Sequence, residues 1–176
     1  MQTYRIATLD DVVPIKALMS EAIDRLQRPF LDEPTIRASH SLMGLDTQLI
    51  SDSTYFVVEE NGCLVGCGGW SRRATLYGSD HADGRDDNLL DPASDPARFR
   101  AMYTHPSFVR RGVGLLILRV SEAAAMAEGF TRGELAGTLA GVPFYSACGW
   151  RELEHFSHGG QTDSQIPLVR MDKILR

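Results

Sequence analysis

The sequence predicts an α/β fold in which short strands alternate with amphipathic helices. The chain has 176 residues, an ordinary length for one domain that buries a substantial core. Its apolar fraction is 43% and its charged fraction 23%, close to the averages of globular proteins. Apolar residues recur at helical spacing in some segments and alternate with polar residues in others. We therefore expect residues 1–176 to form a single α/β domain.

The first quarter of the chain predicts one strand followed by two helices. Residues 4–7 have the pattern of a short strand. Oxygen-bearing side chains at residues 8–11 are typical of a helix start, and apolar residues then recur at helical spacing: Val12, Ile15, Leu18, Met19, Ile23 and Leu26. A second helix is expected over residues 34–45, because Pro34 is acceptable in a first turn.

The middle of the chain predicts a hairpin and then a long irregular segment. Residues 55–60 and 63–70 are strand-like and flank Asn61-Gly62, the strongest short hairpin signal. Residues 77–97 are crowded with Gly, Asp, Asn and Pro. A loop of this length is either a surface excursion or a functional lid.

The second half returns to strands and helices. Residues 98–104 alternate, which predicts one face with Phe99, Ala101 and Tyr103 and another with Arg100, Met102 and Thr104. A largely apolar helix follows over residues 112–128, with Gly129 as its stop. The remaining expected elements are a strand at residues 134–138, a helix opened by Pro143 and ended by Gly149, and strands at residues 151–155 and 166–174.

The segment 109–114 carries the clearest functional signal. Val109, Arg110, Arg111, Gly112, Val113 and Gly114 stand between the strand and the apolar helix. The arginines supply positive charge, and the glycines let the backbone approach a ligand. The first amides of a helix have no intrahelical acceptor and are donors for an anion. This arrangement predicts binding of a diphosphate.

This segment resembles the acyl-CoA-binding motif of the GNAT superfamily of N-acetyltransferases, with Val109 where Gln or Arg is usual. A second block, Phe-Tyr-Ser-Ala-Cys-Gly-Trp at residues 144–150, resembles the C-terminal signature of that superfamily. The resemblance implies a mixed, mostly antiparallel central sheet flanked by helices, whose central strands splay apart to form an acyl-CoA cleft. It implies that Tyr145 protonates the departing CoA thiolate.

The resemblance also implies which residues bind acetyl-CoA. The main chain of Met102, Tyr103 and Thr104 would contact the acetyl and pantetheine groups, and the loop from Val109 to Gly114 would hold the pyrophosphate. Thr138 lies seven residues before Tyr145, where many relatives have an Asn or Ser that contacts the cofactor. A threonine hydroxyl is able to take that place.

Transfer of an acetyl group to a primary amine requires a base, an oxyanion donor and an acid. A backbone amide at or near Met102 is the expected oxyanion donor, and Tyr145 is either the acid or a core aromatic residue. Glu134 acts as base directly or through water, or is a solvated strand-end carboxylate. Asp32, Glu33 and His105 are weaker candidates for the base, and ordered water is a further route for the proton. Trp70 either lines the acceptor pocket or belongs to the core.

Composition limits the partners. The net charge of −5 disfavours nucleic acid and is compatible with a cationic amine acceptor, either a small molecule or a peptide. We expect no membrane association, because no apolar run reaches the roughly 20 residues of a span. The N-terminus lacks a signal-peptide pattern, so the expected location is the cytoplasm, and the chain is compatible with a homodimer. We expect no metal, because His155 and His158 have no third ligand at a supporting spacing.

Two other function classes compete with the enzyme. A non-catalytic acyl-CoA sensor would keep the glycine loop and dispense with Tyr145, so the presence of that tyrosine favours the transferase. A nucleotide-binding protein is disfavoured because the sequence lacks both the P-loop pattern and the dinucleotide-binding glycine pattern.

Overall fold

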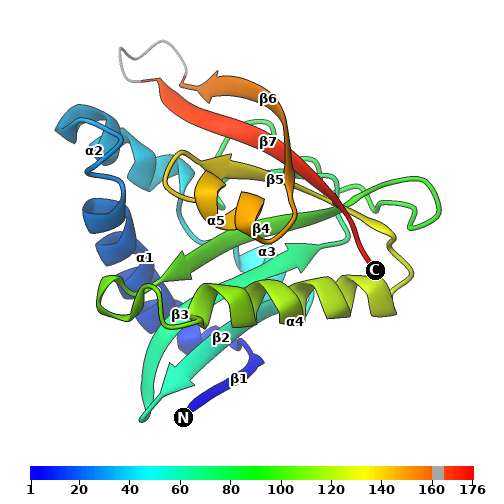
Figure 1. Cartoon of the computed structure of the whole chain (residues 1–176), viewed down its shortest axis with the longest axis horizontal. Helices are drawn as coiled ribbons and strands as arrows, with labels where there is room; N and C mark the ends of the chain where they lie inside the picture. Colours follow the sequence, from blue (N-terminus) through cyan, green and yellow to red (C-terminus); the bar gives the residue numbers. More distant parts are fainter. Residues whose placement is uncertain (160–164) are drawn as a thin grey trace.

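A computed structural model describes residues 1–159 and 165–176 of the chain. Seven strands form one sheet in the order β1-β2-β3-β4-β5-β7-β6 (Figure 1). Every neighbouring pair is antiparallel except β4 and β5, which are parallel. The strands are β1 (Gln2–Ile6), β2 (Tyr55–Glu60), β3 (Cys63–Ser71), β4 (Ala97–Thr104), β5 (Arg132–Thr138), β6 (Arg151–His158) and β7 (Ile166–Ile174). The prediction of a mixed, mostly antiparallel sheet is confirmed.

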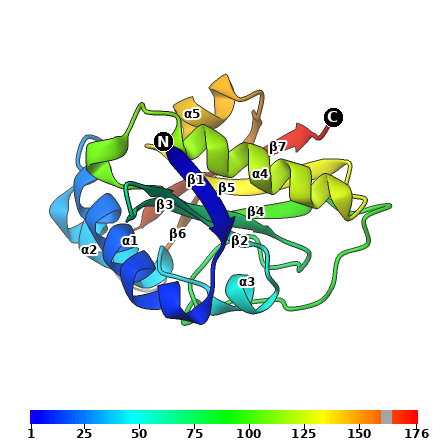
Figure 2. The same ribbon diagram turned by 90° about the horizontal axis from the view of Figure 1, so that it is seen from below.

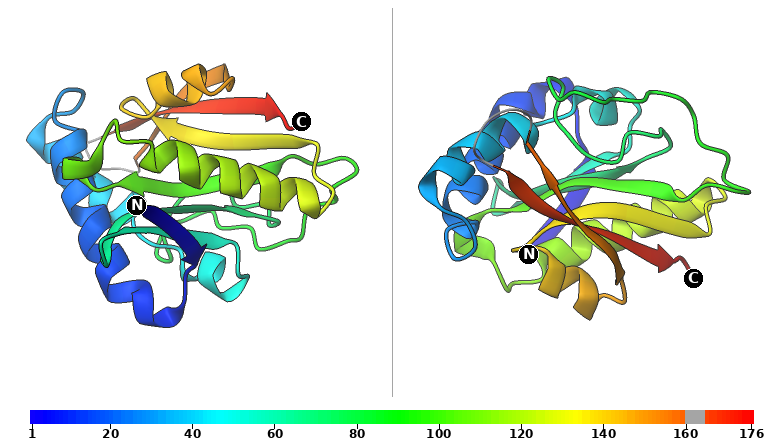
Figure 3. Two further views of the ribbon diagram at one scale, coloured as in Figure 1. Left: turned by 60° about the horizontal axis from the view of Figure 1, so that its bottom comes forward. Right: turned by 90° about the horizontal axis from the view of Figure 1, so that it is seen from above.

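Helices cover both faces of the sheet (Figure 2). They are α1 (Val12–Leu26), α2 (Glu33–Leu42), α3 (Thr47–Ser51), α4 (Val113–Ala127) and α5 (Val142–Ala147), with short 3₁₀ turns at Leu9–Asp11 and Pro106–Phe108. α4 and α5 lie on one face, and α1, α2 and α3 lie on the other. α1 and α2 gather at the end of the sheet toward which β4 and β5 point (Figure 3). Over the described residues, no helix has the length and apolar character needed to span a bilayer.

The predicted hairpin is confirmed. Asn61 and Gly62 connect β2 and β3 with φ of 54° and 78°, the left-handed values that a tight two-residue hairpin turn needs. The region before the hairpin differs from the prediction. α2 ends at Leu42 instead of residue 45, and the five-residue helix α3 follows, with Asp46 accepting a hydrogen bond from the Gln48 amide. A helix this short shows no apolar periodicity, so the pattern of the sequence could not reveal it.

The long helix of the second half forms as expected. α4 begins after Gly112, and the chain leaves it through Gly129 with φ of 94°. Its inner face packs on β3 and β4, with Val113, Ile117 and Leu118 almost completely buried. The helix that carries Tyr145 also forms, and Gly149 follows it with φ of 86°.

The alternation predicted for β4 is wrong. Tyr103 pairs with Cys67 and Arg100 pairs with Gly69, so two residues of β4, Ala101 and Met102, face one residue of β3. This β-bulge, in which Ala101 has φ of 53°, exchanges the faces of the residues that follow it. Phe99 and Met102 pack toward α4, while Ala101 and Tyr103 pack toward α1. The alternating pattern of the sequence cannot show such an insertion, because a side-chain period of two assumes no extra residue.

Two neighbours hold this bulge in place. The hydroxyl of Tyr55, a fully buried residue of β2, donates a hydrogen bond of 2.6 Å to the carbonyl oxygen of Ala101. On β3, a Cβ at position 68 would lie 2.7 Å from Cγ of Met102, so only glycine fits opposite the bulge.

The bulge coincides with the divergence of β4 from β5. The two strands are paired only from Ala97 to Phe99 and from Gly133 to Leu135, whereas β5 stays paired with β7 along its whole length. Beyond Phe99, the edge of β4 that faces β5 forms no backbone pairs with β5. The expectation that these two strands splay apart is therefore confirmed.

Candidate active site

A cavity of about 740 Å³ opens where β4 and β5 separate. One part of its wall, here called the α4 side, comes from the 109–114 loop, the start of α4, the ends of β4 and β5, and α5. The other part, here called the α1 side, is formed by the ends of α1 and α2 with the residues that follow them, by the segment after β3, and by one residue each of β4 and β7. Its residues are Ala22, Leu26, Gln27, Phe30, Leu42, Met43, Gly44, Leu76, Tyr77, Gly78, Arg100 and Leu168. The cavity thus joins two chemically different surfaces.

The loop before α4 is built to receive an anion. Leu116 is the first residue whose amide bonds back into the helix, to the carbonyl oxygen of Gly112, and no side chain caps the helix. The preceding amides of the first turn are therefore free donors. Arg110, with φ of 62°, and Gly112, with φ of 85°, turn the backbone around this site. Arg110 forms no ion pair with any described residue, and its charge is available to a ligand.

Arg111, unlike Arg110, is held by contacts with the sheet. Its guanidinium pairs with Glu60 at the end of β2 and lies 4.6 Å from the ring centre of Phe108. Its carbonyl oxygen accepts a hydrogen bond from the Gln2 side chain. The arginine fastens the loop to the sheet, and it is not among the residues that line the cavity.

The other residues expected to bind acetyl-CoA surround the cavity. Met102, Tyr103 and Thr104 line it from β4, and Thr138 lines it from the end of β5, as do Val109, Arg110, Gly112, Val113 and Gly114 from the loop and helix. Thr138 is engaged locally, because its hydroxyl accepts a hydrogen bond from the Gly141 amide. A Cβ at Gly114 would lie 3.4 Å from Cζ of Phe144, an ordinary contact distance, so the start of α4 lies directly beside α5.

Tyr145 lies on α5 with its side chain in the wall of the cavity. A Cβ at Gly141 would lie 3.0 Å from its ring, and the ring centre of Trp150 is 6.3 Å away, so packing fixes the direction of the phenol. Burial raises the pKa of Tyr145 above its ordinary value of 10.0. Burial also raises the pKa of Tyr103, with the neighbouring Cys67 and Tyr145 adding to the effect. The Tyr145 phenol is therefore protonated at neutral pH.

Glu134 lies apart from Tyr145 and the 109–114 loop. It stands near the start of β5, where the strand is still paired with β4, and its carboxylate forms ion pairs with Arg98 and, at 3.5 Å, with Arg170. It does not belong to the cavity wall. The structure brings Tyr145 and the loop together and leaves Glu134 outside, which gives no support to its role as base.

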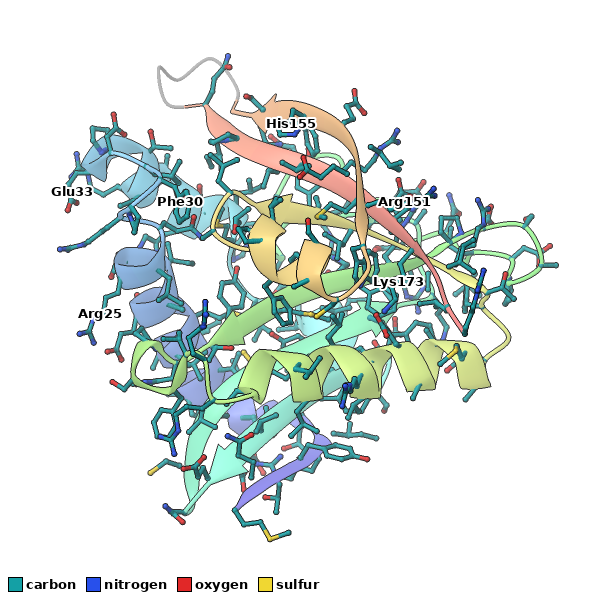
Figure 4. The ribbon with its side chains drawn as sticks, viewed as in Figure 1. Arg25, Phe30, Glu33, Arg151, His155 and Lys173 are labelled. Atoms are coloured by element: carbon teal, nitrogen blue, oxygen red, sulfur yellow. The ribbon has the colours of Figure 1, made fainter. Side chains whose placement is uncertain are left out.

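The other carboxylate and histidine candidates also lie outside the cavity wall. Asp32 caps α2 by accepting a hydrogen bond from the Thr35 amide. Glu33 points away from the body of the molecule (Figure 4). His105 lies with its Nε2 atom 3.2 Å from a carboxylate oxygen of Glu21. None of the described residues that line the cavity is an aspartate, glutamate, histidine or lysine.

Trp70 belongs to the core. It is 1% exposed and packs edge-on against Phe130 at 5.7 Å. The segment after β3 does reach the cavity, because Leu76, Tyr77 and Gly78 line its α1 side. Among the described residues, no group of three or more His, Cys, Asp or Glu side chains is arranged to hold a metal ion.

Comparison with known proteins identifies the family. The family model described as an acetyltransferase (GNAT) domain matches residues 51–152, more than half of the chain. The chain belongs to the GNAT family. This acetyltransferase therefore uses acetyl-CoA, in agreement with the resemblance of its two sequence motifs. No curated protein matches it with significant sequence similarity.

Solved structures share the fold of this acetyltransferase at low sequence identity. A GCN5-related N-acetyltransferase from Rhodopseudomonas palustris superimposes with a TM-score of 0.73 at 16% identity, covering 99% of this chain and 96% of the other. The PaiA N-acetyltransferase from Thermoplasma acidophilum, solved with coenzyme A, gives 0.67 at 12% identity with 99% of each chain covered. For yncA from Salmonella typhimurium, solved with its cofactor acetyl-CoA, the values are 0.63 and 17%, covering 99% and 94%.

Three residues that matter for the site were missed by the sequence reasoning. Tyr55 supports the bulge of β4, and Gln27 and Arg100 form part of the α1 side of the cavity. Their roles depend on contacts between residues far apart in the chain, such as the 2.5 Å hydrogen bond from Arg100 to Asp46. No local motif marks such contacts.

Proposed function

We propose that this acetyltransferase transfers the acetyl group of acetyl-CoA to a primary amine of a small molecule or peptide by direct attack, with Tyr145 as general acid. The observation that carries the proposal is the position of Tyr145. Its protonated phenol lines the same cavity as the free amides of the 109–114 loop and the unpaired end of β4. A CoA thioester laid along that path would bring its sulfur to the tyrosine.

The residues fit a CoA molecule in chemical terms. Arg110 and the free amides at the start of α4 suit the pyrophosphate. The unpaired backbone edge of Met102, Tyr103 and Thr104 suits pantetheine, whose amides pair as an added strand would. A backbone amide at or near Met102 would donate a hydrogen bond to the carbonyl oxygen as it gains charge.

Acetyl transfer replaces the carbon–sulfur bond of the thioester with a carbon–nitrogen bond. The amine nitrogen forms a bond to the acetyl carbon, the carbon–sulfur bond breaks, and Tyr145 gives a proton to the leaving thiolate. The proton released by the amine passes to water, because the described wall of the cavity contains no carboxylate, histidine or lysine. The Tyr145 phenolate then regains a proton from water, which restores the starting enzyme. We assign no side chain as base.

Thiol release tests the proposal. The full chain is incubated with acetyl-CoA and a panel of amines, and free thiol and acetylated amine are both quantified. We expect the two products to appear in equal amounts and to depend on the amine. If acetyl-CoA binds but no amine increases thiol release above hydrolysis, the acyl-CoA sensor becomes the better account.

A further inference from the structure

The side chain of Tyr55 reaches across the sheet to the bulge of β4. Tyr55 belongs to β2, and β3 lies between β2 and β4, so the side chain crosses two strand spacings, about 10 Å in all. A Cβ at position 69 of β3 would lie 2.2 Å from the carbonyl oxygen of Thr54 and 3.0 Å from Cδ2 of the tyrosine ring. Glycine at position 69 therefore leaves the ring its path to the carbonyl oxygen of Ala101.

This hydrogen bond fixes the orientation of the peptide between Ala101 and Met102. The described residues contain no cis peptide bond. In a trans peptide, the carbonyl oxygen and the N–H of the following residue point in opposite directions. Because Tyr55 reaches the carbonyl from the β2 side of β4, the N–H of Met102 is directed away from it, toward the side on which β5 diverges and the cavity opens.

The bulge depends on support from outside β4. Ala101 has φ of 53°, in the left-handed region that is unfavourable for a residue with a Cβ. Among the described residues, the hydroxyl of Tyr55 is the one side-chain group that hydrogen-bonds to the peptide between Ala101 and Met102. On the opposite face, a Cβ at position 68 would lie 2.7 Å from Cγ of Met102 and 3.0 Å from its Cα, so Gly68 supplies the space that the displaced residue needs.

The phenol of Tyr55 is a lasting hydrogen-bond donor. Its residue is 0% exposed, and burial raises its pKa well above 10.0, with the neighbouring Cys67 adding to the effect. The hydroxyl thus keeps its proton throughout the neutral range. A hydrogen bond accepted by the carbonyl oxygen polarises the whole peptide and makes its N–H a stronger donor. The contact therefore acts on the strength of the Met102 N–H as well as on its direction.

Resting on the proposed function, we propose that Tyr55 is a positioning residue for acetyl transfer. Through the carbonyl of Ala101 it aims the N–H of Met102 at the thioester oxygen and strengthens that N–H as the oxyanion donor. Tyr55 does not itself touch acetyl-CoA in this proposal, because it is fully buried and is not among the residues that line the cavity. Its effect falls on the transition state, in which the oxygen gains negative charge, and not on the binding of the cofactor.

Tyr55→Phe tests the proposal, because it removes the hydroxyl and keeps the ring. We expect the single-turnover rate of amine-dependent thiol release to fall about tenfold, less than the roughly 10²–10³-fold cost of losing a whole oxyanion donor. The Kd for CoA should stay within about twofold of the wild type. Tm should fall by a few degrees, because a buried carbonyl loses its donor. A wild-type rate in the folded variant would overturn the inference.

Thr54→Val is the matched control. Thr54 is 1% exposed, and its hydroxyl donates a 3.2 Å hydrogen bond to the carbonyl oxygen of Leu49, away from the bulge. The variant therefore removes a buried bond of the same kind from the adjacent residue, and it should lower Tm without changing the rate. An equal loss of rate in Thr54→Val and Tyr55→Phe would show a merely structural role and overturn the assignment.

The carbonyl stretch of bound acetyl-CoA gives a readout that does not require turnover. Difference infrared spectra with [1-¹³C]acetyl-CoA isolate this band, and a hydrogen bond to the thioester oxygen moves it to lower frequency. We expect the band of the wild-type and Thr54→Val complexes to lie below that of free acetyl-CoA. In the Tyr55→Phe complex the band should move back toward the free value. An identical band in the wild type and Tyr55→Phe would contradict the proposal.

Gly68→Ala reaches the same donor from the other face of the sheet. The added methyl group displaces Met102 and leaves the hydroxyl of Tyr55 in place, so this variant keeps the test open if Tyr55→Phe does not fold. It should lower the rate and shift the infrared band in the same direction, and an unchanged rate and band would overturn the inference. Absence of amine-dependent thiol release from the wild type would instead contradict the proposed function, and the infrared comparison would still decide the role of Tyr55.

Discussion

Phe99 of β4 and Leu135 of β5 form the last pair of a parallel ladder that is only three residues long. Beyond them the bulge at Ala101 changes the course of β4, while β5 continues against β7. The cavity that receives acetyl-CoA in our proposal begins at this point and includes Phe99 in its wall. A short ladder thus leaves backbone groups free for a ligand in the middle of an otherwise continuous sheet.

The backbone conformation of Gly112 should be required for cofactor binding. Its φ of 85° strains any residue with a Cβ by about 1–2 kcal/mol, and relief of that strain would move the amides at the start of α4. We expect Gly112→Ala to weaken CoA binding about tenfold by calorimetry. The control Gly62→Ala places the same strain, at φ of 78°, in the β2–β3 turn, and it should leave CoA affinity unchanged. Equal affinity in both variants would remove the loop from the binding site.

Glu134 should contribute to stability and not to proton removal. Its carboxylate is 12% exposed and pairs with two arginines, so Glu134→Gln should lower the free energy of unfolding by about 1.5–3 kcal/mol in urea titrations. The pH dependence of kcat/KM should stay that of the wild type. Glu154→Gln, which removes an exposed partner of Arg170, should cost less than about 1 kcal/mol. A flattened pH profile in Glu134→Gln would restore this residue as the base.

The buried carboxylate of Asp46 should hold the α1 side of the cavity together. It bonds to Arg100 and Arg85, and it accepts a hydrogen bond from the Gln48 amide at the start of α3. Asp46→Ala leaves two guanidinium groups without their shared partner and should lower the free energy of unfolding by about 3–5 kcal/mol. Asp83→Ala, at an exposed loop position, should change it by less than about 0.5 kcal/mol. A similar loss in both variants would contradict the role given to Asp46.

The sequence was most informative where function depends on local backbone and residue type. The 109–114 loop could be predicted because two glycines, two arginines and a helix start are adjacent in the chain. The block that contains Tyr145 could be predicted for the same reason, because its residues are also adjacent in the chain. The α1 side was not, because Gln27, Arg100 and Asp46 come together only through the packing of α1, α3 and β4.

The alternation expected for residues 98–104 failed, and the role expected for Glu134 gained no support, for the same physical reason. The alternation of residues 98–104 ignored the bulge at Ala101, which the buried hydroxyl of Tyr55 supports from another strand. The role of Glu134 ignored Arg98 and Arg170, which lie far away in the sequence and beside it in the sheet. Contacts of this kind are invisible to spacing and periodicity.

The pH dependence should follow the acceptor and not Tyr145. Because burial raises the pKa of Tyr145 above 10.0, its neutral, proton-donating form persists beyond the pH at which an ordinary tyrosine ionises. We expect kcat/KM to rise with pH through the pKa of each amine and to show no fall below pH 10. Profiles measured with leucinamide, an α-amine, and with isopentylamine, a simple alkylamine, should therefore have different midpoints, because the pKa of an α-amino group lies below that of an alkylamine. One midpoint shared by both amines would indicate a titrating group of the enzyme.

The most direct test of the account is the turnover of Tyr145→Phe. The variant keeps the ring that packs against Gly141 and Trp150 and removes only the hydroxyl. With chemistry shown to be rate-limiting, we predict that kcat for amine-dependent thiol release falls about 10²–10⁴-fold, while the Kd for CoA is unchanged. Tyr4→Phe, on the exposed edge strand β1, should behave as the wild type in both measurements. Wild-type kcat in Tyr145→Phe would contradict the assignment of Tyr145 as the proton donor.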